Sequence, residues 1–282
     1  MNGFNFETGN WPDLSALNDM AEKIRLTMSV VGDTVIKLQE ITRAIPETIK
    51  RYQEVIRPLA QKASEISAMI NSDAFSDALR RSATYFQSVS IMGEKQFVCW
   101  EPIPRSIAEE IIDASNPNGI LKKYALREKG AVLESVIEKC AENVYVQKRS
   151  RVFSQAVEAF RNKHYDLALI GILSVVDSVL SDTSKQIKNT SIFKRGAALI
   201  EKLENNETLD NDEYAVITLV MTFEATMTTL GANSDFSKKE PTGLNRHWIM
   251  HGRSGRRRTQ LDCIKLFHFL YGILIVNELA EP

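Results

Sequence analysis

This chain of 282 residues has few cysteines and almost no net charge. The three cysteines, Cys99, Cys140 and Cys263, lie far apart and have no spacing typical of a metal site. Such a small, odd number favours a reducing compartment over a disulfide framework. The formal net charge is only −1, which argues against a protein that coats nucleic acid indiscriminately but permits a local basic site.

Long hydrophobic runs are also missing. Residues 1–7 have neither the basic segment nor the apolar core of a secretory signal, so we expect none. The most apolar stretch, residues 266–279, contains His268, Gly272 and Asn277 and is too short and too polar to span a bilayer. We therefore expect a buried core helix in that stretch and a cytoplasmic protein with no membrane association.

Alternating, strand-like patterns are nearly absent, and helical spacing takes their place. From Leu14 to Ile70, apolar residues recur every three or four positions without a change of phase. A 3.5-residue repeat of this length predicts helices packed lengthwise, either as a coiled coil or as an antiparallel hairpin. Because Pro46 and Pro58 each remove a backbone donor, a hairpin or kink is favoured over one straight rod. We interpret residues 1–92 as a helical arm for spacing or assembly.

Proline, asparagine and glycine gather in residues 93–119, which predicts a linker between the arm and residues 120–282. Beyond this linker, helical patterns cover residues 128–147, 152–160, 165–180, 212–230 and 259–278. The last of these helices begins at Thr259, where Thr259 and Asp262 have the spacing of a capping box. The prediction is an all-α protein in which a long N-terminal arm precedes a compact helical bundle.

The helix expected over residues 165–180 is apolar on most of its surface, which predicts a central and buried position. Asp177 lies within this helix, and two interpretations of it stay open. A buried carboxylate is costly unless a cation or hydrogen bonds stabilise it, so Asp177 is either paired with a cation or part of a solvent-facing stripe with neighbouring serines.

Two of the four histidines, His247 and His251, stand four positions apart directly after Arg246. On a helix the two histidines share a face, whereas Arg246 and His251 lie about 140° apart. Asn245 is a candidate N-cap and Gly252 a candidate C-terminal stop, which together predict about a turn and a half of helix.

Three interpretations of this cluster stay open. The first is zinc binding, because His247 and His251 have the i, i+4 spacing, although the zinc-protease glutamate and a third ligand are missing. The second is plain packing of both histidines at a helix end. The third is phosphodiester cleavage without metal or cofactor. Seven lysines and arginines against two acidic residues give residues 235–258 a local charge of +5, which is typical of a phosphate-binding surface.

In the third interpretation, the 2′-hydroxyl of RNA is the nucleophile. A neutral histidine can remove its proton or return a proton to the leaving 5′-oxygen, and an arginine can stabilise the charge that grows on phosphorus. Arg246 is then expected to hold the phosphate, His251 to act as general base or acid, and His247 to orient or share the proton transfer.

Arg246 followed by four residues and His251 resembles the R-x4-6-H motif of the HEPN superfamily. These are all-α domains of prokaryotic toxins, antiviral abortive-infection proteins and RNA-processing enzymes. The polar His247 after the arginine and the order of the expected helices are similar to that family's pattern. The resemblance covers roughly residues 145–282.

The resemblance implies a metal-independent endoribonuclease that acts as a homodimer, in phage defence or as a toxin, with its active site at the dimer interface. It implies catalytic roles for Arg246, His251 and His247 and a supporting role for Asp177. A regulatory or antitoxin protein is a further expected partner. RNA contacts are expected from Asn245, Arg253, Arg256, Arg257 and Arg258. The alternative is a non-catalytic RNA-binding or protein-interaction module that uses the arm for assembly, since some members of the family do not cleave RNA.

Overall fold

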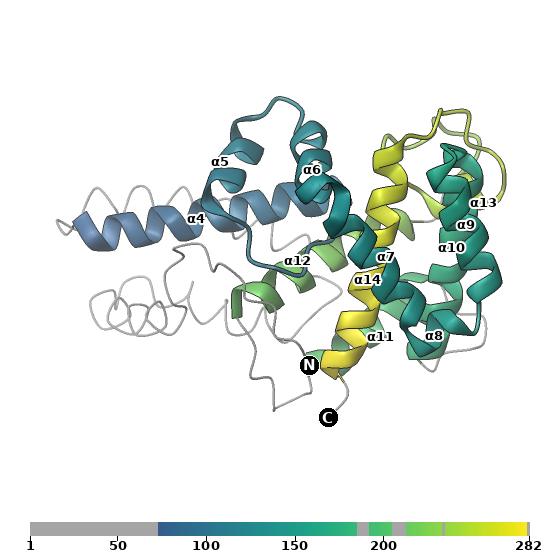
Figure 1. Ribbon diagram of the computed structural model, residues 1–282. Coiled ribbons are helices and arrows are strands. Elements are labelled where there is room, and N and C mark those ends of the chain that lie inside the picture. Colours follow the sequence, from purple (N-terminus) through teal and green to yellow (C-terminus); the bar gives the residue numbers. More distant parts are fainter. Residues whose placement is uncertain (1–72, 185–191, 205–212, 233–234, 281–282) are drawn as a thin grey trace.

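The computed structural model describes residues 73–184, 192–204, 213–232 and 235–280, and every regular element in these ranges is a helix (Figure 1). The prediction of an all-α protein is therefore confirmed for the described residues. Most of the expected N-terminal arm, residues 1–72, lies outside them.

The helices follow one another with short connections. In chain order they are α4 (Asp73–Glu94), α5 (Arg105–Asp113), α6 (Asn118–Ala125), the 3-10 turn η2 (Glu128–Gly130), α7 (Ala131–Glu142), α8 (Val144–Gln147), α9 (Ser150–Arg161), α10 (Tyr165–Thr183), α11 (Ile192–Glu204), α12 (Glu213–Leu230), α13 (Arg246–Met250) and α14 (Gln260–Ala280).

The last helix, α14, is the centre of the fold. It contacts α6, α7, α10, α11 and α12, and nearly every residue from Cys263 to Asn277 is buried (Figure 1). Among the described helices, α14 alone is long and apolar enough to cross a bilayer, yet 72% of its apolar window is buried inside the protein. This burial by neighbouring helices confirms the core helix that we expected over residues 266–279.

The start of α14 is the capping box that the sequence predicts. The N–H of Thr259 donates to Oδ2 of Asp262 at 2.9 Å, and the N–H of Asp262 donates to Oγ1 of Thr259 at 3.3 Å. These reciprocal bonds satisfy N–H groups that have no partner within the helix. They fix the point at which the loop after α13 ends.

Residues 93–119, which we expected to be a linker, contribute to the same core as the later helices. Val98 and Cys99 are buried, and helix α5 follows them. The N–H of Cys99 donates to Oγ1 of Thr222 in α12 at 3.1 Å, and the carbonyl oxygen of Val98 lies 3.1 Å from Nδ1 of His268 in α14. The proline and glycine residues therefore mark turns around a buried segment that joins α12 to α14.

Helix α10 packs closely on α9 and α14. A Cβ at Gly171 would lie 2.7 Å from the Cβ of Ala156, so a glycine is needed where α9 and α10 approach each other. Helix α9 reaches α14 as well, because the rings of Phe160 and Phe267 meet edge to face with their centroids 5.3 Å apart. Helix α10 therefore packs against two helices that also contact each other.

Candidate functional site

Helix α13 carries the residues of the candidate site, and Asn245 begins it. Oδ1 of Asn245 accepts a hydrogen bond from the N–H of Trp248 at 3.2 Å, as the predicted N-cap should. Its Nδ2 donates to the carbonyl oxygen of Ala232 at 3.0 Å, and only 2% of the residue is exposed. Both polar atoms of this side chain are thus bonded inside the protein.

Gly252 ends α13 in the left-handed conformation, with a φ of 62°. The N–H of Gly252 donates to the carbonyl oxygen of Ile249 at 3.1 Å, and that of Arg253 donates to Trp248 at 2.9 Å. This pair of bonds is a Schellman motif, which favours glycine because a Cβ is strained at positive φ. The predicted C-terminal stop is therefore confirmed.

Arg246, the first residue of α13, forms an ion pair with Asp177 of α10. Its Nε donates to Oδ2 at 2.9 Å, and its Nη2 donates to the same oxygen. The side chains are 27% and 20% exposed, so the pair is largely removed from water. Of the two interpretations of Asp177, the carboxylate–cation pair is confirmed.

A second arginine approaches Asp177 from α11, at its backbone. Nη1 of Arg195 lies 3.5 Å from the backbone carbonyl oxygen of Asp177. Oδ1 of Asp177 and Nε of Arg195 are both enclosed, and neither has a hydrogen-bond partner in the described part of the chain. Residues of three helices, α10, α11 and α13, therefore meet at Asp177.

His247 and His251 lie together on another side of α13. Their ring centroids are 5.3 Å apart, and the ring of Phe236 lies 6.2 Å from the first and 5.6 Å from the second. The guanidinium of Arg253 lies 5.4 Å above the same phenylalanine ring. His251 is exposed and His247 is half-buried, so both imidazoles stand at the protein surface beside a cation.

Within one chain there are two separate pairs: Arg246 with Asp177, and His247 with His251. Among the described residues, no hydrogen bond or ring contact joins Arg246 to His247 or to His251. The helix geometry explains this separation, because residues five apart point about 140° away from each other. Nor does any group of three His, Cys, Asp or Glu side chains in the described ranges have a geometry that could hold a metal ion.

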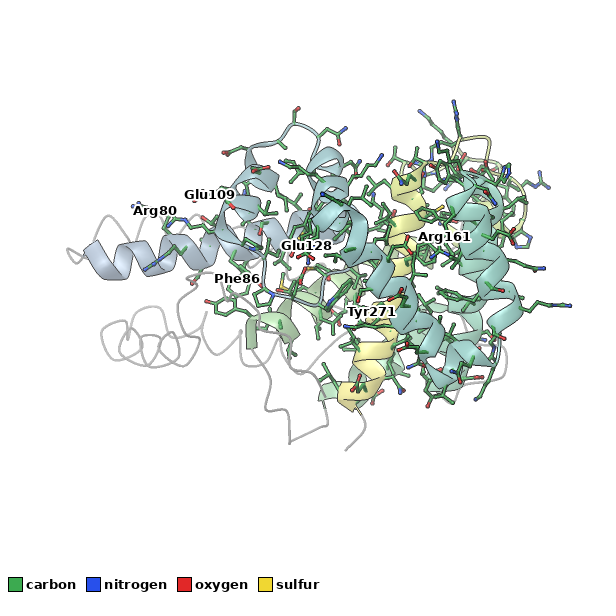
Figure 2. The ribbon with its side chains drawn as sticks, viewed as in Figure 1. Arg80, Phe86, Glu109, Glu128, Arg161 and Tyr271 are labelled. Atoms are coloured by element: carbon green, nitrogen blue, oxygen red, sulfur yellow. The ribbon has the colours of Figure 1, made fainter. Side chains whose placement is uncertain are left out.

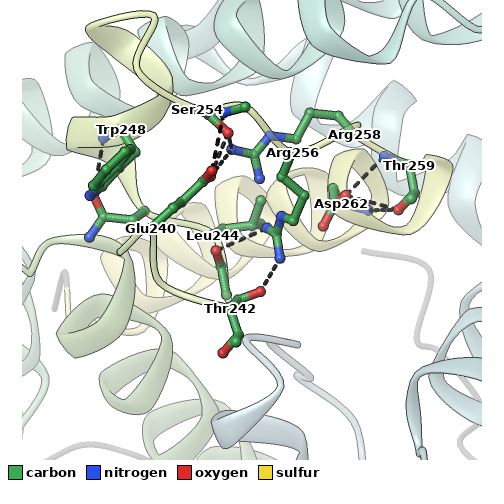
Figure 3. Close-up of polar contacts among 12 residues, drawn as sticks. Glu240, Thr242, Leu244, Trp248, Ser254, Arg256, Arg258, Thr259 and Asp262 are labelled. Carbon is green, nitrogen blue, oxygen red and sulfur yellow. Dashed lines mark hydrogen bonds and ion pairs between the residues drawn. The ribbon is translucent and has the colours of Figure 1, made fainter. Parts of the chain in front are cut away.

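Glu240 organises the basic loop that follows α13 (Figure 3). Its Oε1 accepts hydrogen bonds from Nη2 of Arg258 at 3.0 Å and from the hydroxyl of Ser254, and its Oε2 accepts from the N–H of Gly255 at 3.2 Å. Burial acts to raise the pKa of Glu240, but the bond from Ser254 and the charge of Arg258 outweigh it, so the pKa is lowered overall.

The four arginines of the loop therefore divide into two kinds. Arg258 is only 4% exposed, and Arg256 donates to the carbonyl oxygens of Thr242 and Gly243, the second at 2.9 Å (Figure 3). These two arginines hold the loop in place. Arg253 and Arg257 are exposed, so they are the cations of the loop that face solvent.

Phe236 and Glu240 are site residues that the sequence did not single out. Phe236 stands in a polar loop with no periodic pattern, and Glu240 entered only as a negative charge among seven positive ones. Their roles depend on contacts with residues 11 to 18 positions away. A local sequence pattern does not predict contacts over that separation.

Comparisons with family models, with curated proteins and with solved structures gave no match to this chain. The structure supports an all-α domain, and the resemblance to the HEPN superfamily rests on the sequence motif.

Proposed function

We propose that this chain is a metal-independent endoribonuclease in which Arg246, His251 and His247 act on RNA with support from Asp177. The observation that carries the proposal is the arrangement on α13. A guanidinium held by a carboxylate occupies one side, and two adjacent surface imidazoles occupy another. A positioned cation for phosphate and a group that moves protons near neutral pH are the two requirements for 2′-hydroxyl attack.

The contacts of Arg246 suggest how it binds phosphate. Its Nε and Nη2 face Asp177, while Nη1 has no bonded partner among the described residues and is not enclosed. Nη1 is therefore the donor that can reach a phosphate oxygen while the other edge stays fixed. In this proposal Asp177 is a positioning residue, because it holds the guanidinium and does not touch RNA.

A homodimer would supply the missing convergence of arginine and histidine. Four large apolar side chains are exposed in the described ranges, and three of them, Leu167, Ile170 and Met250, lie on α10 and α13. Leu167, Ile170 and Asp177 share one stripe of α10 by their spacing. In this proposal a second copy covers these side chains, and the active site combines the arginine of one protomer with the histidines of its partner.

The RNA strand is expected to lie over the exposed cations. Arg253 and Arg257 are the solvent-facing arginines of the loop, and Arg253 lies on the ring of Phe236 next to the histidines. An aromatic ring beside a guanidinium suits an unpaired RNA base, which stacks on such groups. Single-stranded segments are therefore the expected substrates.

The test is cleavage of an end-labelled single-stranded RNA by the full chain, with and without EDTA. We expect cleavage in EDTA, products with a 2′,3′-cyclic phosphate, and a rate at least about 100-fold lower in His251→Ala. The matched control is His164→Ala, an exposed histidine outside the cluster, which should cleave at the normal rate.

Three results would overturn the proposal. They are cleavage that stops in EDTA, a normal rate in His251→Ala, and RNA that is bound but left intact by the wild-type chain. The last result would favour the alternative, a non-catalytic RNA-binding module. The dependence of RNA affinity on salt concentration would then report the number of phosphate contacts.

A further inference from the structure

Helix α4 ends in a Schellman motif that carries a glutamine where glycine is the usual residue. The N–H of Gln96 donates to the carbonyl oxygen of Gly93 at 2.8 Å, and that of Phe97 donates to Met92 at 3.0 Å. The φ of Gln96 is 60°, in the left-handed region that glycine adopts more readily than a residue with a Cβ. Because glycine would end the helix at lower cost, the side chain of Gln96 is the feature that needs an explanation.

The amide of Gln96 is buried and holds both backbone groups of one distant residue. Its Nε2 donates to the carbonyl oxygen of Leu244 at 2.6 Å and to Oγ1 of Thr229 at 2.9 Å, and its Oε1 accepts from the N–H of Leu244 at 2.5 Å. Only 2% of Gln96 is exposed. The hydroxyl of Thr229 donates to the carbonyl oxygen of Ala225 at 3.1 Å, so its oxygen is left as an acceptor for Nε2. These three bonds of Gln96 are called the Gln96 clamp below.

The helix that carries the clamp is itself fixed on α12. Figure 2 labels Arg80 and Phe86 on α4, and this helix packs on α12. A Cβ at Gly93 would lie 2.7 Å from the Cβ of Ala225 in α12, so the two helices approach closely at the end of α4. The clamp therefore starts from a backbone that is held in place.

The clamped residue stands two positions before Arg246. Leu244 is followed by Asn245, the N-cap of α13, and Arg246 is the first residue of that helix. A displacement of Leu244 is passed on to α13, because only these two residues separate them. Displacements of about 1 Å are enough to disturb a catalytic arrangement, and the ion pair of Arg246 with Asp177 is the contact that such a shift would alter first.

Gly243 provides the room that the clamp occupies. A Cβ at Gly243 would lie 2.6 Å from Oε1, 3.0 Å from Cδ and 3.2 Å from Nε2 of Gln96, and these are the three atoms nearest to it. Gly243→Ala would therefore push the amide of Gln96 away from Leu244. In a chain that also has Gln96→Ala, the added methyl group would meet none of these atoms.

We propose that Gln96 is a positioning residue of the α13 site. It holds the backbone at Leu244 from the end of α4, across 148 positions, and so sets where Arg246 and the two histidines stand. It does not touch RNA. The inference rests on the proposed function only where cleavage is the readout, since the position of α13 can be measured without RNA.

The first test is hydrogen–deuterium exchange of the full chain. The N–H groups of His251 and Arg253 donate to carbonyl oxygens within α13, and they should exchange about 10-fold faster in Gln96→Ala. The N–H groups of α14 should exchange as in the wild type, which shows that the variant is folded. Gly243→Ala should have the same effect. The double variant should also be about 10-fold faster, and not about 100-fold, because both changes remove the same clamp.

Gln96→Gly separates the side chain from the backbone conformation. It removes the clamp and relieves the positive φ, so faster exchange of α13 in this variant comes from the lost side chain and not from strain. The matched control is Lys163→Gly. Lys163 ends α9 with a φ of 63° and the same two backbone bonds, and its side chain is exposed. This control should leave the exchange of α13 unchanged.

The second test is the kinetics of RNA cleavage. Gln96→Ala should lower kcat about 10-fold and change KM less than about threefold, because a misplaced Arg246 affects the transition state more than the binding of the strand. Lys163→Gly should cleave as the wild type does.

Four results would overturn the positioning role. They are unchanged α13 exchange in Gln96→Ala and Gln96→Gly, multiplied effects in the double variant, an equal rise of α14 exchange in every clamp variant, and a wild-type kcat in Gln96→Ala. A wild-type chain that leaves RNA intact would overturn the ribonuclease proposal alone, because the exchange experiment still decides whether Gln96 positions α13.

Discussion

Loss of the ion pair between Arg246 and Asp177 should destabilise the protein far more than loss of an exposed pair. Two unit charges about 4 Å apart attract by about 4 kcal/mol at the effective dielectric constant of a protein surface. Desolvation of the two side chains, which are 27% and 20% exposed, offsets part of this attraction. Hydrogen bonds to charged groups retain a net 1.5 to 3 kcal/mol, roughly. We therefore expect a coupling energy of about 2 kcal/mol.

The assay is a double-mutant cycle of Asp177→Ala and Arg246→Ala, with urea unfolding followed by circular dichroism. The matched control is the cycle of Arg105→Ala and Glu109→Ala. That pair has a similar Nε to Oε1 distance of 2.8 Å, but its side chains are 58% and 48% exposed. Its coupling energy should not exceed about 0.5 kcal/mol. Equal coupling energies in the two cycles would refute the reasoning, because burial would then make no difference.

Two further predictions concern the end of α13 and the interior. Gly252→Ala should lower the free energy of unfolding by about 1 kcal/mol, because the φ of Gly252 is 62°. The control Gly255→Ala has open space around it and should be nearly neutral. Equal losses of stability in the two variants, measured by urea unfolding, would contradict this prediction. Burial lowers the pKa of His268 from 6.5 to about 3, although the hydrogen bond to Val98 opposes this shift. Between these two pH values the unfolded chain therefore binds a proton that the folded chain does not. Stability should therefore fall as the pH drops from 6.5 toward 3, by up to about 1.4 kcal/mol per pH unit, and a pH titration of His268→Gln that keeps the full slope would disprove this origin.

The features that the sequence predicted well are local ones. The cap at Asn245, the stop at Gly252 and the capping box at Thr259 each depend on bonds between residues at most five positions apart. A helix is likewise formed by contacts between neighbouring turns, so its sequence pattern is local too. The apolar composition of α10 and α14 predicted that both helices are buried. In these cases the interactions that form the structure join residues close in sequence, and a short sequence pattern therefore predicts them.

The features that the sequence did not predict depend on distant contacts. Nε2 of Gln96 donates to the carbonyl oxygen of Leu244 at 2.6 Å, and its Oε1 accepts from the N–H of Leu244 at 2.5 Å, across 148 positions. A Cβ at Gly243 would lie 2.6 Å from that Oε1, so the adjacent glycine leaves room for the contact. Residues 93–119 had the composition of a linker, and only the packing of Val98 and Cys99 reveals their place in the core.

The anchoring of α13 bears on whether its histidines are merely packed at a helix end. A helix of five residues has no stability of its own in water, and the contacts that hold this one come from Gln96, Asp177 and the buried Trp248. His251 takes part in none of them and is exposed. The tertiary contacts therefore fix the backbone that carries the His251 imidazole. Its ring meets those of Phe236 and His247, yet the residue stays exposed, so the imidazole is both positioned and accessible to a ligand.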